Sequence, residues 1–357
     1  MKKFAYYLPQ FHEIPENNKW WGKGFTEWVN VKKAKSLVKK QKQPKVPLAE
    51  NYYELDKNTL LWQANMANEY RIDGMIFYHY YFCGKKLLEK PAEILLNEKS
   101  IPMKFFFCWA NHSWYRSWEG TKELLLEQTY GDIRDWEKHF QYLLPFFQDD
   151  RYEKKDNKPL FMIFLSSFKE FKELTAYFDK RCKECGFDGI QLIESVQRYE
   201  SKVETDSNTL VHTREPNCSS MNFKFSTNNL LFRIVNKIGK TLNKYIGLRY
   251  LETYDGSTLL DIAGKHYSED VVPGLFFEWD NTPRHGYRGY LITSPSKKVF
   301  MNYMDTVKNS EYIFINAWNE WCEGMMLEPT VENGYKYLEW IKEWTEKNEN
   351  RVNGTGI

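Results

Sequence analysis

Residues 311–329 read EYIFINAWNEWCEGMMLEP, and this stretch decides both the expected fold and the expected chemistry. Its first part, Tyr312 to Ala317, is a short apolar and aromatic run that is typical of a buried strand. The run ends abruptly at two carboxylates, Glu320 and Glu323, which stand three residues apart beside tryptophans. Glutamate is depleted in strands and is seldom buried without a partner, so this cluster is costly unless it has a role.

Two interpretations of the cluster stay open on the residues alone. Glycosidic chemistry needs one carboxyl that protonates the leaving oxygen and a second that acts as base or nucleophile. The flat indoles of Trp318 and Trp321 suit the apolar faces of sugar rings, and the amide of Asn319 suits sugar hydroxyls. The other interpretation is an ordinary strand end with a capping asparagine and surface glutamates.

Three motifs resemble known families. Residues 319–324, NEWCEG, resemble the NEWxEG signature of glycoside hydrolase family 99, the endo-α-mannosidases. Residues 6–12, YYLPQFH, and 20–28, WWGKGFTEW, resemble the WbsX family of bacterial O-antigen and capsule gene clusters. WbsX proteins carry a family-99-like domain and are usually labelled glycosyltransferases. This second resemblance runs from about Phe4 to about Trp340.

The resemblance implies a retaining enzyme that makes or cleaves an α-glycosidic linkage in O-antigen or capsular polysaccharide biosynthesis. It matches Glu320 to the family-99 base, which deprotonates the sugar 2-hydroxyl to form a 1,2-anhydro intermediate, and Glu323 to the general acid. A different class of protein stays open, a non-catalytic glycan-binding protein on a decayed barrel. The presence of both glutamates argues against it, because binding alone needs no acid of raised pKa.

The composition narrows the class of protein. The chain has 357 residues, of which 42% are hydrophobic, enough for a large core. Its net charge of +2 does not indicate a nucleic-acid partner. The sequence contains no run of 18 apolar residues, so it predicts no membrane-spanning helix. The N-terminus has no apolar segment of signal-peptide length. We therefore expect a cytoplasmic protein.

Strand and helix patterns alternate along the chain. We expect strands at 3–8, 74–80, 103–108, 160–165, 189–194, 209–213, 272–279 and 312–317, with helices at 60–69, 89–97, 136–147, 168–185, 300–309 and 331–347. This alternation predicts an α/β fold, a (β/α)8 TIM barrel, which the family-99 resemblance also implies. A doubly wound sheet is the alternative, but no glycine-rich phosphate motif follows the first strand. We expect one catalytic domain over 1–350, an insertion at about 214–270 and a tail at 351–357, with a loop at 20–28.

In a TIM barrel the loops after the strands meet at one end and build the site. We therefore expect the polar and aromatic residues near those strand ends to line one sugar pocket. Besides the two glutamates, they are Tyr6, Gln10, His12, Tyr78, His79, Trp109, Asn111, His112, Trp114, Trp279, Asp280, Asn281, Arg284, Trp318, Asn319 and Trp321.

Some of these residues have a plainer interpretation. His79 is equally well explained as a satisfied core histidine, and Asn111–His112 as turn chemistry. The segment 279–284 resembles a WDNTPR element of the WbsX family, which lines the pocket by resemblance and is a tight turn by its residues alone. The histidines lack the local spacing of a zinc motif, so we expect no metal and no cofactor.

Residues 229–246 read NLLFRIVNKIGKTLNKYI and predict a basic amphipathic helix. Leu230, Ile234, Ile238, Leu242 and Ile246 recur at intervals of four, and no acidic residue lies between Lys224 and Arg249. Such stripes usually pack, here on the barrel or on a second subunit. The other interpretation is a helix in a membrane interface, which suits a substrate that is an oligosaccharide or a lipid-linked glycan at the inner leaflet.

Overall fold

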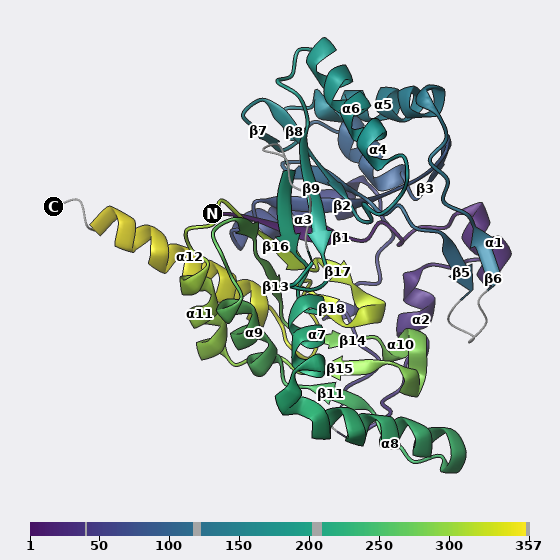
Figure 1. The fold of residues 1–357 in the computed structure, drawn as a ribbon, viewed down its shortest axis with the longest axis vertical. Helices are drawn as coiled ribbons and strands as arrows, with labels where there is room; N and C mark the ends of the chain where they lie inside the picture. The colour runs from purple at the N-terminus through teal and green to yellow at the C-terminus, as the bar shows by residue number, and fades with distance from the viewer. Residues whose placement is uncertain (40, 117–122, 202–208, 355–357) are drawn as a thin grey trace.

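The computed structural model describes residues 1–39, 41–116, 123–201 and 209–354, and they form a parallel α/β barrel (Figure 1). Seven strands run side by side in the order β10-β9-β8-β4-β2-β1-β16. They are β1 (Lys2–Tyr7), β2 (Gly74–Phe82), β4 (Lys104–Trp109), β8 (Lys158–Ile163), β9 (Gln191–Val196), β10 (Thr209–Thr213) and β16 (Tyr312–Asn316).

The segment 271–276 is the seventh strand in chain order, and it closes the barrel between β10 and β16. Its first half, β12 (Val271–Val272), pairs with β10, and its second half, β13 (Gly274–Phe276), pairs with β16. Pro273 lies between the halves; it has no N–H to donate, but its carbonyl accepts a hydrogen bond from the Phe314 N–H at 3.0 Å. The predicted TIM barrel is therefore confirmed.

Helices cover the outside of the barrel (Figure 1). They are α3 (Lys57–Glu69), α4 (Lys90–Asn97), α5 (Ile133–Phe147), α6 (Phe171–Glu184), α11 (Lys297–Thr306) and α12 (Lys336–Gly354). Each matches a predicted helix with its ends moved by a few residues, except that α12 continues into the tail expected at 351–357. Residues 355–357 of that tail lie outside the described part of the chain.

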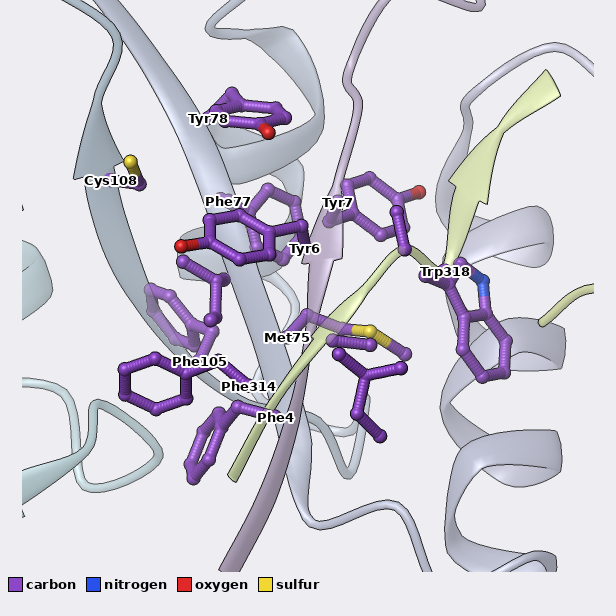
Figure 2. Close-up of a cluster of buried hydrophobic side chains, with 14 of the residues drawn as sticks. Phe4, Tyr6, Tyr7, Met75, Phe77, Tyr78, Phe105, Cys108, Phe314 and Trp318 are labelled. Atoms are coloured by element: carbon purple, nitrogen blue, oxygen red, sulfur yellow. The ribbon is translucent and has the colours of Figure 1, made fainter. Parts of the chain in front are cut away.

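Aromatic side chains fill the barrel and the layer around it (Figure 2). Every residue of β2 is buried, as expected for a parallel strand covered on both faces. The rings of Tyr7 and Phe77 stack with centroids 4.4 Å apart, and those of Phe4 and Phe106 lie 5.2 Å apart. Gly74 begins β2 because a Cβ there would lie 2.5 Å from the Lys104 carbonyl oxygen. This packing holds the strand ends that carry the site.

Short elements that the sequence did not predict surround the carboxyl ends of the strands. The prediction of a loop at 20–28 is wrong in part, because two helices overlap the ends of this segment. Helix α1 (Pro15–Trp21) starts with a proline at its first position, and α2 (Glu27–Lys33) begins after Gly22 and Gly24, which have positive φ. Two β-hairpins are also present. One pairs β5 (Trp114–Arg116) with β6 (Glu123–Leu126), and the other pairs β17 (Asn319–Glu320) with β18 (Met325–Met326). The remaining short elements are β3 (Lys85–Leu87), α10 (Thr282–His285) and 3-10 turns at 48–50, 227–229, 286–288 and 321–323. A further short strand, β7 (Lys154–Lys155), pairs with the amino end of β8 instead.

The chain between β10 and β12 holds more structure than the single helix expected there. It contains α7 (Asn217–Phe225), α8 (Leu230–Ile246), β11 (Glu252–Tyr254) and α9 (Gly256–Lys265). Strand β11 joins β15 (Tyr290–Ile292) and β14 (Trp279–Asp280) in a separate three-stranded sheet. That sheet ties the segment to the loop after the seventh barrel strand.

Helix α8 lies at the edge of the molecule (Figure 1). The residues of its apolar stripe at 230, 234, 238 and 246 are exposed, so the helix packs with another face. Asn236 and Gly239 are its buried residues, and Phe232 packs against Phe223. The expectation that the stripe packs on the barrel is therefore wrong, because the stripe faces outward. Among the described residues, no helix is long and apolar enough to cross a membrane.

Candidate active site

A cavity of about 520 Å³ opens at the carboxyl ends of the barrel strands. Both carboxylates of the NEWCEG motif line it, Glu320 and Glu323. Six other predicted site residues line it as well, namely Gln10, Tyr78, His112, Trp114, Trp279 and Arg284. Residues that are far apart in the sequence thus meet in one hollow, as the barrel predicts.

The hairpin after β16 places the two carboxylates. Asn319 fixes its start, because its Oδ1 accepts from the Leu8 N–H at 2.7 Å and its Nδ2 donates to the Leu8 carbonyl at 3.1 Å. Glu320 ends β17, and Glu323 ends the 3-10 turn that follows. Gly324 then reverses the chain with a φ of 59°. Asn319 is thus a clamp between β1 and the hairpin rather than part of the cavity wall.

Glu320 is the buried member of the pair. It is 7% exposed, and its Oε2 atom has no hydrogen-bond partner in the described structure. Burial and the nearby Glu323 together raise its pKa to about 8, although Arg284 and Arg214 act in the opposite direction. Glu320 therefore holds its proton to a higher pH than an ordinary glutamate does.

Arg284 connects the acidic groups of the site. Its Nη1 donates to Glu323 Oε1 at 2.6 Å, and its Nη2 donates to Glu27, which is fully buried in α2. The same Nη2 lies 3.8 Å from Glu320 Oε2. Burial opposes the charge of Arg284, but Glu27 and Glu323 hold its pKa well above the ordinary value. Arg284 thus donates directly to Glu323, whereas Glu320 lies at a longer distance from it.

The tryptophans divide into two groups. Trp114 and Trp279 line the cavity, together with Trp20 and Trp21 from α1, which lie in the WWGKGFTEW motif but were missed as site residues. Trp109, Trp318 and Trp321 are almost fully buried instead. The indole N–H of Trp109 donates to the Tyr81 carbonyl at 3.1 Å.

The indoles of Trp318 and Trp321 both point at a third carboxyl, Glu328. Its oxygens accept from Trp318 Nε1 at 3.0 Å, Trp321 Nε1 at 2.6 Å, Gln63 Nε2 at 2.6 Å and Tyr53 Oη at 2.8 Å. Burial raises the pKa of Glu328 to about 7 although all four hydrogen bonds lower it. The two tryptophans next to the acids are thus anchored in the structure behind the site and do not line the cavity.

Other predicted residues lie behind the cavity wall. Tyr6 stacks on Tyr78 with ring centroids 5.5 Å apart. His12 is buried, and burial lowers its pKa to about 4. The Nε2 atoms of His79 and His139 lie 2.8 Å apart in the core, which matches the core-histidine interpretation.

Three more predicted residues position the chain near the site. Asn111 accepts from the Leu165 N–H and donates to the Leu165 carbonyl. Asp280 accepts from Gln41 and Gln43, and Asn281 Oδ1 accepts from the Tyr290 N–H. None of the three lines the cavity.

Sequence reasoning missed several residues that line the cavity. They include Asn17, Tyr80, Arg214, Asn217 and Asn316. Their position at strand ends could have identified three of them from the sequence. Arg214 directly follows β10, Tyr80 lies near the end of β2 and Asn316 is the last residue of β16. No cluster of three or more His, Cys, Asp or Glu side chains able to hold a metal occurs within the described ranges.

Comparisons with known proteins agree with this architecture. The chain is 30% identical over 360 residues to an uncharacterized protein WxcX of Xanthomonas campestris pv. campestris, with 94% of this chain covered. The same protein from strain B100 is 31% identical. The chain spans about half the length of these curated relatives, 48% in each case.

Solved structures with the same fold include a GH99 endo-α-mannosidase from Bacteroides thetaiotaomicron. Its complex with bis-tris-propane matches with a TM-score of 0.54 at 15% identity, covering 99% of this chain and 98% of that one. A glycoside hydrolase-like protein matches with a TM-score of 0.55 at 12% identity, covering 96% and 93%. The model of the glycosyltransferase WbsX family matches residues 3–341, and the chain therefore belongs to the WbsX glycosyltransferase family.

Proposed function

We propose that this chain is a retaining enzyme that makes or cleaves an α-glycosidic linkage, with Glu320 and Glu323 as its acid–base pair. The observation that carries the proposal is that both carboxyls line one cavity at the carboxyl end of the barrel, with tryptophans on its walls. A cavity of about 520 Å³ is of the size that small ligands occupy, and indoles suit sugar rings.

The family-99 resemblance supports a two-step mechanism. Glu320 takes the proton of the sugar 2-hydroxyl, O2 attacks C1, and the bond from C1 to the leaving oxygen breaks as Glu323 protonates that oxygen. An acceptor hydroxyl then attacks C1 of the 1,2-anhydro sugar and gives its proton to Glu323, while Glu320 returns its proton to O2. Two displacements at C1 retain its configuration, as in other retaining enzymes.

The raised pKa of Glu320 bears on the first step of this mechanism. That step needs Glu320 ionised and Glu323 protonated, whereas in the free protein burial raises the pKa of Glu320 and Glu323 pairs with Arg284. Two interacting carboxyls titrate as a pair, so glycan binding has only to move one proton between them. A hydrogen bond from the sugar 2-hydroxyl to Glu320 favours its ionised form and therefore this transfer.

Glycosyl fluorides test the pair and its roles. We expect Glu320→Gln and Glu323→Gln each to lower turnover of glycosides by about 10²–10⁴-fold, with the fold intact by circular dichroism. Fluoride leaves without a full proton transfer, so Glu323→Gln should keep turnover of α-mannosyl or α-glucosyl fluoride, whereas Glu320→Gln should not. Near wild-type glycoside turnover in either variant contradicts the mechanism. Glycan binding without any product from the wild type favours the glycan-binding alternative.

The family's description as glycosyltransferases favours transfer to a sugar acceptor in the assembly of a surface polysaccharide. Transfer and hydrolysis use the same two carboxyls and differ only in whether a sugar hydroxyl or water attacks C1. Product analysis with and without an added glycan acceptor separates them. An elongated product supports the biosynthetic role, and a shortened product alone supports hydrolysis.

We further propose that α8 binds an anionic bilayer, where lipid-linked glycans are held. Its outward apolar face consists of Leu230, Leu231, Ile234, Val235, Ile238, Tyr245 and Ile246, which are 46–72% exposed. Burying this apolar area in the interface favours binding, as for other interfacial helices. Gly239 keeps the opposite face tight against the protein, since a Cβ there would lie 2.3 Å from the Tyr250 ring.

The charges around α8 determine which partner fits. Lys224 and Lys240 both pair with the buried Glu252, whose single negative charge offsets one of their two positive charges. Arg233, Lys237, Lys244 and Arg249 form no ion pair among the described residues. Each such cation contributes about 1 kcal/mol near an anionic surface. Charge complementarity therefore favours a membrane with anionic lipids over a second copy of this chain, whose α8 carries the same charge.

Vesicle flotation tests the membrane contact. We expect co-flotation with phosphatidylglycerol vesicles that falls with salt and is lost when Arg233, Lys237 and Lys244 become Glu. The matched control changes the exposed Lys298, Lys308 and Lys347 to Glu and should still float. No flotation at low salt, or equal flotation with phosphatidylcholine, contradicts the proposal. A stable dimer that shields the apolar face contradicts it as well.

A further inference from the structure

Arg214 is a cation on the cavity wall with a free end. It follows β10, and its Nη2 donates to the Tyr78 hydroxyl at 2.8 Å. The guanidinium lies over the Phe164 ring at 4.2 Å and near the Tyr6 ring at 5.3 Å. Its Nη1 atom is buried and has no hydrogen-bond partner within the described ranges. Three aromatic groups thus hold the guanidinium in place, and one of its ends is left unused.

The charge of Arg214 has no direct partner among the described residues. No carboxylate of the described residues forms an ion pair with it, whereas Arg284 has Glu27 and Glu323. Glu320 and Glu323 act on Arg214 through their charges without contacting it. Arginine does not lose its proton in proteins, and buried charges are normally paired. Within the described ranges, Arg214 is therefore a cation without a carboxylate in direct contact, beside the candidate catalytic pair.

His112 adds a second unused polar atom to the same wall. Its ring lies 5.4 Å from the Phe164 ring, and its buried Nδ1 has no partner in the described structure. Burial and the charge of Arg214 both lower the pKa of His112, so the imidazole is neutral and one of its ring nitrogens is a donor. Arginine is the side chain that most often pairs with carboxylate and phosphate oxygens.

We infer that Arg214, with His112, binds an anionic group of the glycan, a carboxylate or a phosphate ester, next to the sugar held by Glu320 and Glu323. The inference rests on the proposed function and deepens it, because it makes the substrate class an acidic glycan, such as one with a uronic acid or a phosphorylated sugar. An arriving anion would give Arg214 a counter-charge in direct contact and accept from its free Nη1.

Matched pairs of sugars test this inference without any need for turnover. Binding is measured by tryptophan fluorescence for glucose against glucuronate, galactose against galacturonate, mannose against mannuronate, and glucose against glucose 6-phosphate. We expect at least one acidic member to bind the wild type at least 10-fold more tightly than its neutral partner. Arg214→Gln should bring that ratio close to one, and Arg214→Lys should keep part of it. The uronate and phosphate arms show which anion is bound.

Two controls separate this role from others. Arg134→Gln removes the same charge from an exposed position outside the cavity and should leave the ratio unchanged. If Arg214 only positions Tyr78, Arg214→Gln will weaken the binding of neutral and of acidic sugars by the same factor. That result overturns the inference. A wild type with no preference in any pair also overturns it. Failure here leaves the fluoride assay of Glu320 and Glu323 unaffected, so the two proposals fail independently.

Discussion

The Nη1 atom of Arg284 donates to Oε1 of Glu323 at 2.6 Å, and this contact joins distant parts of the chain. The same guanidinium binds Glu27, which is 257 residues earlier in the sequence. Glu27 belongs to WWGKGFTEW, Arg284 to WDNTPR and Glu323 to NEWCEG. One buried side chain thus connects three motifs, which explains why they occur together in one chain.

Replacing Arg284 by Gln should damage both the fold and the chemistry. It leaves Glu27 buried and unpaired, and removal of one partner of a buried ion pair costs about 3–5 kcal/mol. It also removes the cation that holds Glu323. We expect the free energy of unfolding, measured by guanidinium denaturation, to fall by that amount and turnover to be lost.

A double variant separates the two effects of Arg284. Glu27→Gln together with Arg284→Gln removes the unpaired buried charge and should recover most of the lost stability. Turnover should stay low, because Glu323 still lacks its partner. Recovery of turnover along with stability would show that Arg284 acts on the fold alone.

Gly324 sets the position of Glu323, so Gly324→Ala should impair the site. The residue has a left-handed φ of 59°, and an added Cβ would lie 3.0 Å from the Asp280 Cβ and N atoms. Strained backbone of this kind costs about 1–3 kcal/mol. A displacement of about 1 Å of Glu323 would cost on the order of 10² in turnover. Kinetics and thermal melting measure both effects, and a wild-type turnover number in this variant would contradict the expectation.

The two groups of tryptophans should respond differently to substitution. Trp279→Ala and Trp114→Ala remove cavity walls and should weaken glycan binding by about 3–10-fold, the equivalent of about 0.5–1.5 kcal/mol, with little change in melting temperature. Trp321→Ala empties a buried position and should cost about 3–5 kcal/mol of stability. Glycan titration and thermal melting test this contrast. Weak binding by Trp321→Ala at full stability would place its indole in the site after all.

The barrel was predictable because its strands are apolar runs of strand length separated by helical patterns. The carboxylates were predictable as candidates because glutamate is unusual directly after such a run, as Glu320 shows. Sequence periodicity does not tell which way a side chain turns at a strand end. Trp318 and Trp321 turn away from the cavity because Glu328 accepts from both indoles, a contact created by the tertiary structure.

Arg214 is a second example of what the sequence alone does not predict. Its position after a strand is visible in the sequence, but whether a carboxylate contacts it depends on which residues surround it in space. The α8 stripe was read correctly as amphipathic, and its outward orientation depends on Gly239 and Tyr250 meeting on the opposite face. Local pattern therefore predicted which elements form, and burial decided what each side chain contacts.

The raised pKa of Glu320 should make the stability of the protein fall with pH in a defined window. Its pKa is about 8 when folded and 4.5 when unfolded, so between these values the folded protein holds a proton that the unfolded chain has released. Unfolding then releases a proton, and stability falls as pH rises through this range, by at most about 1.4 kcal/mol per pH unit.

Other groups also titrate between pH 7 and 8, but they are the same in the wild type and in Glu320→Gln. The pKa of Glu215 and of Glu328 is raised only to about 7, so their contributions to the slope end near that pH. Buried histidines such as His79 and His212, whose pKa is lowered to about 3, contribute a slope of the opposite sign that fades as pH rises above 7, where the unfolded chain loses its last histidine protons. We therefore expect guanidinium denaturation between pH 7 and 8 to show that the stability of the wild type falls relative to that of Glu320→Gln. The exposed Glu349→Gln should behave as the wild type, and an equal slope in Glu320→Gln would mean that Glu320 is not the buried proton carrier of the site.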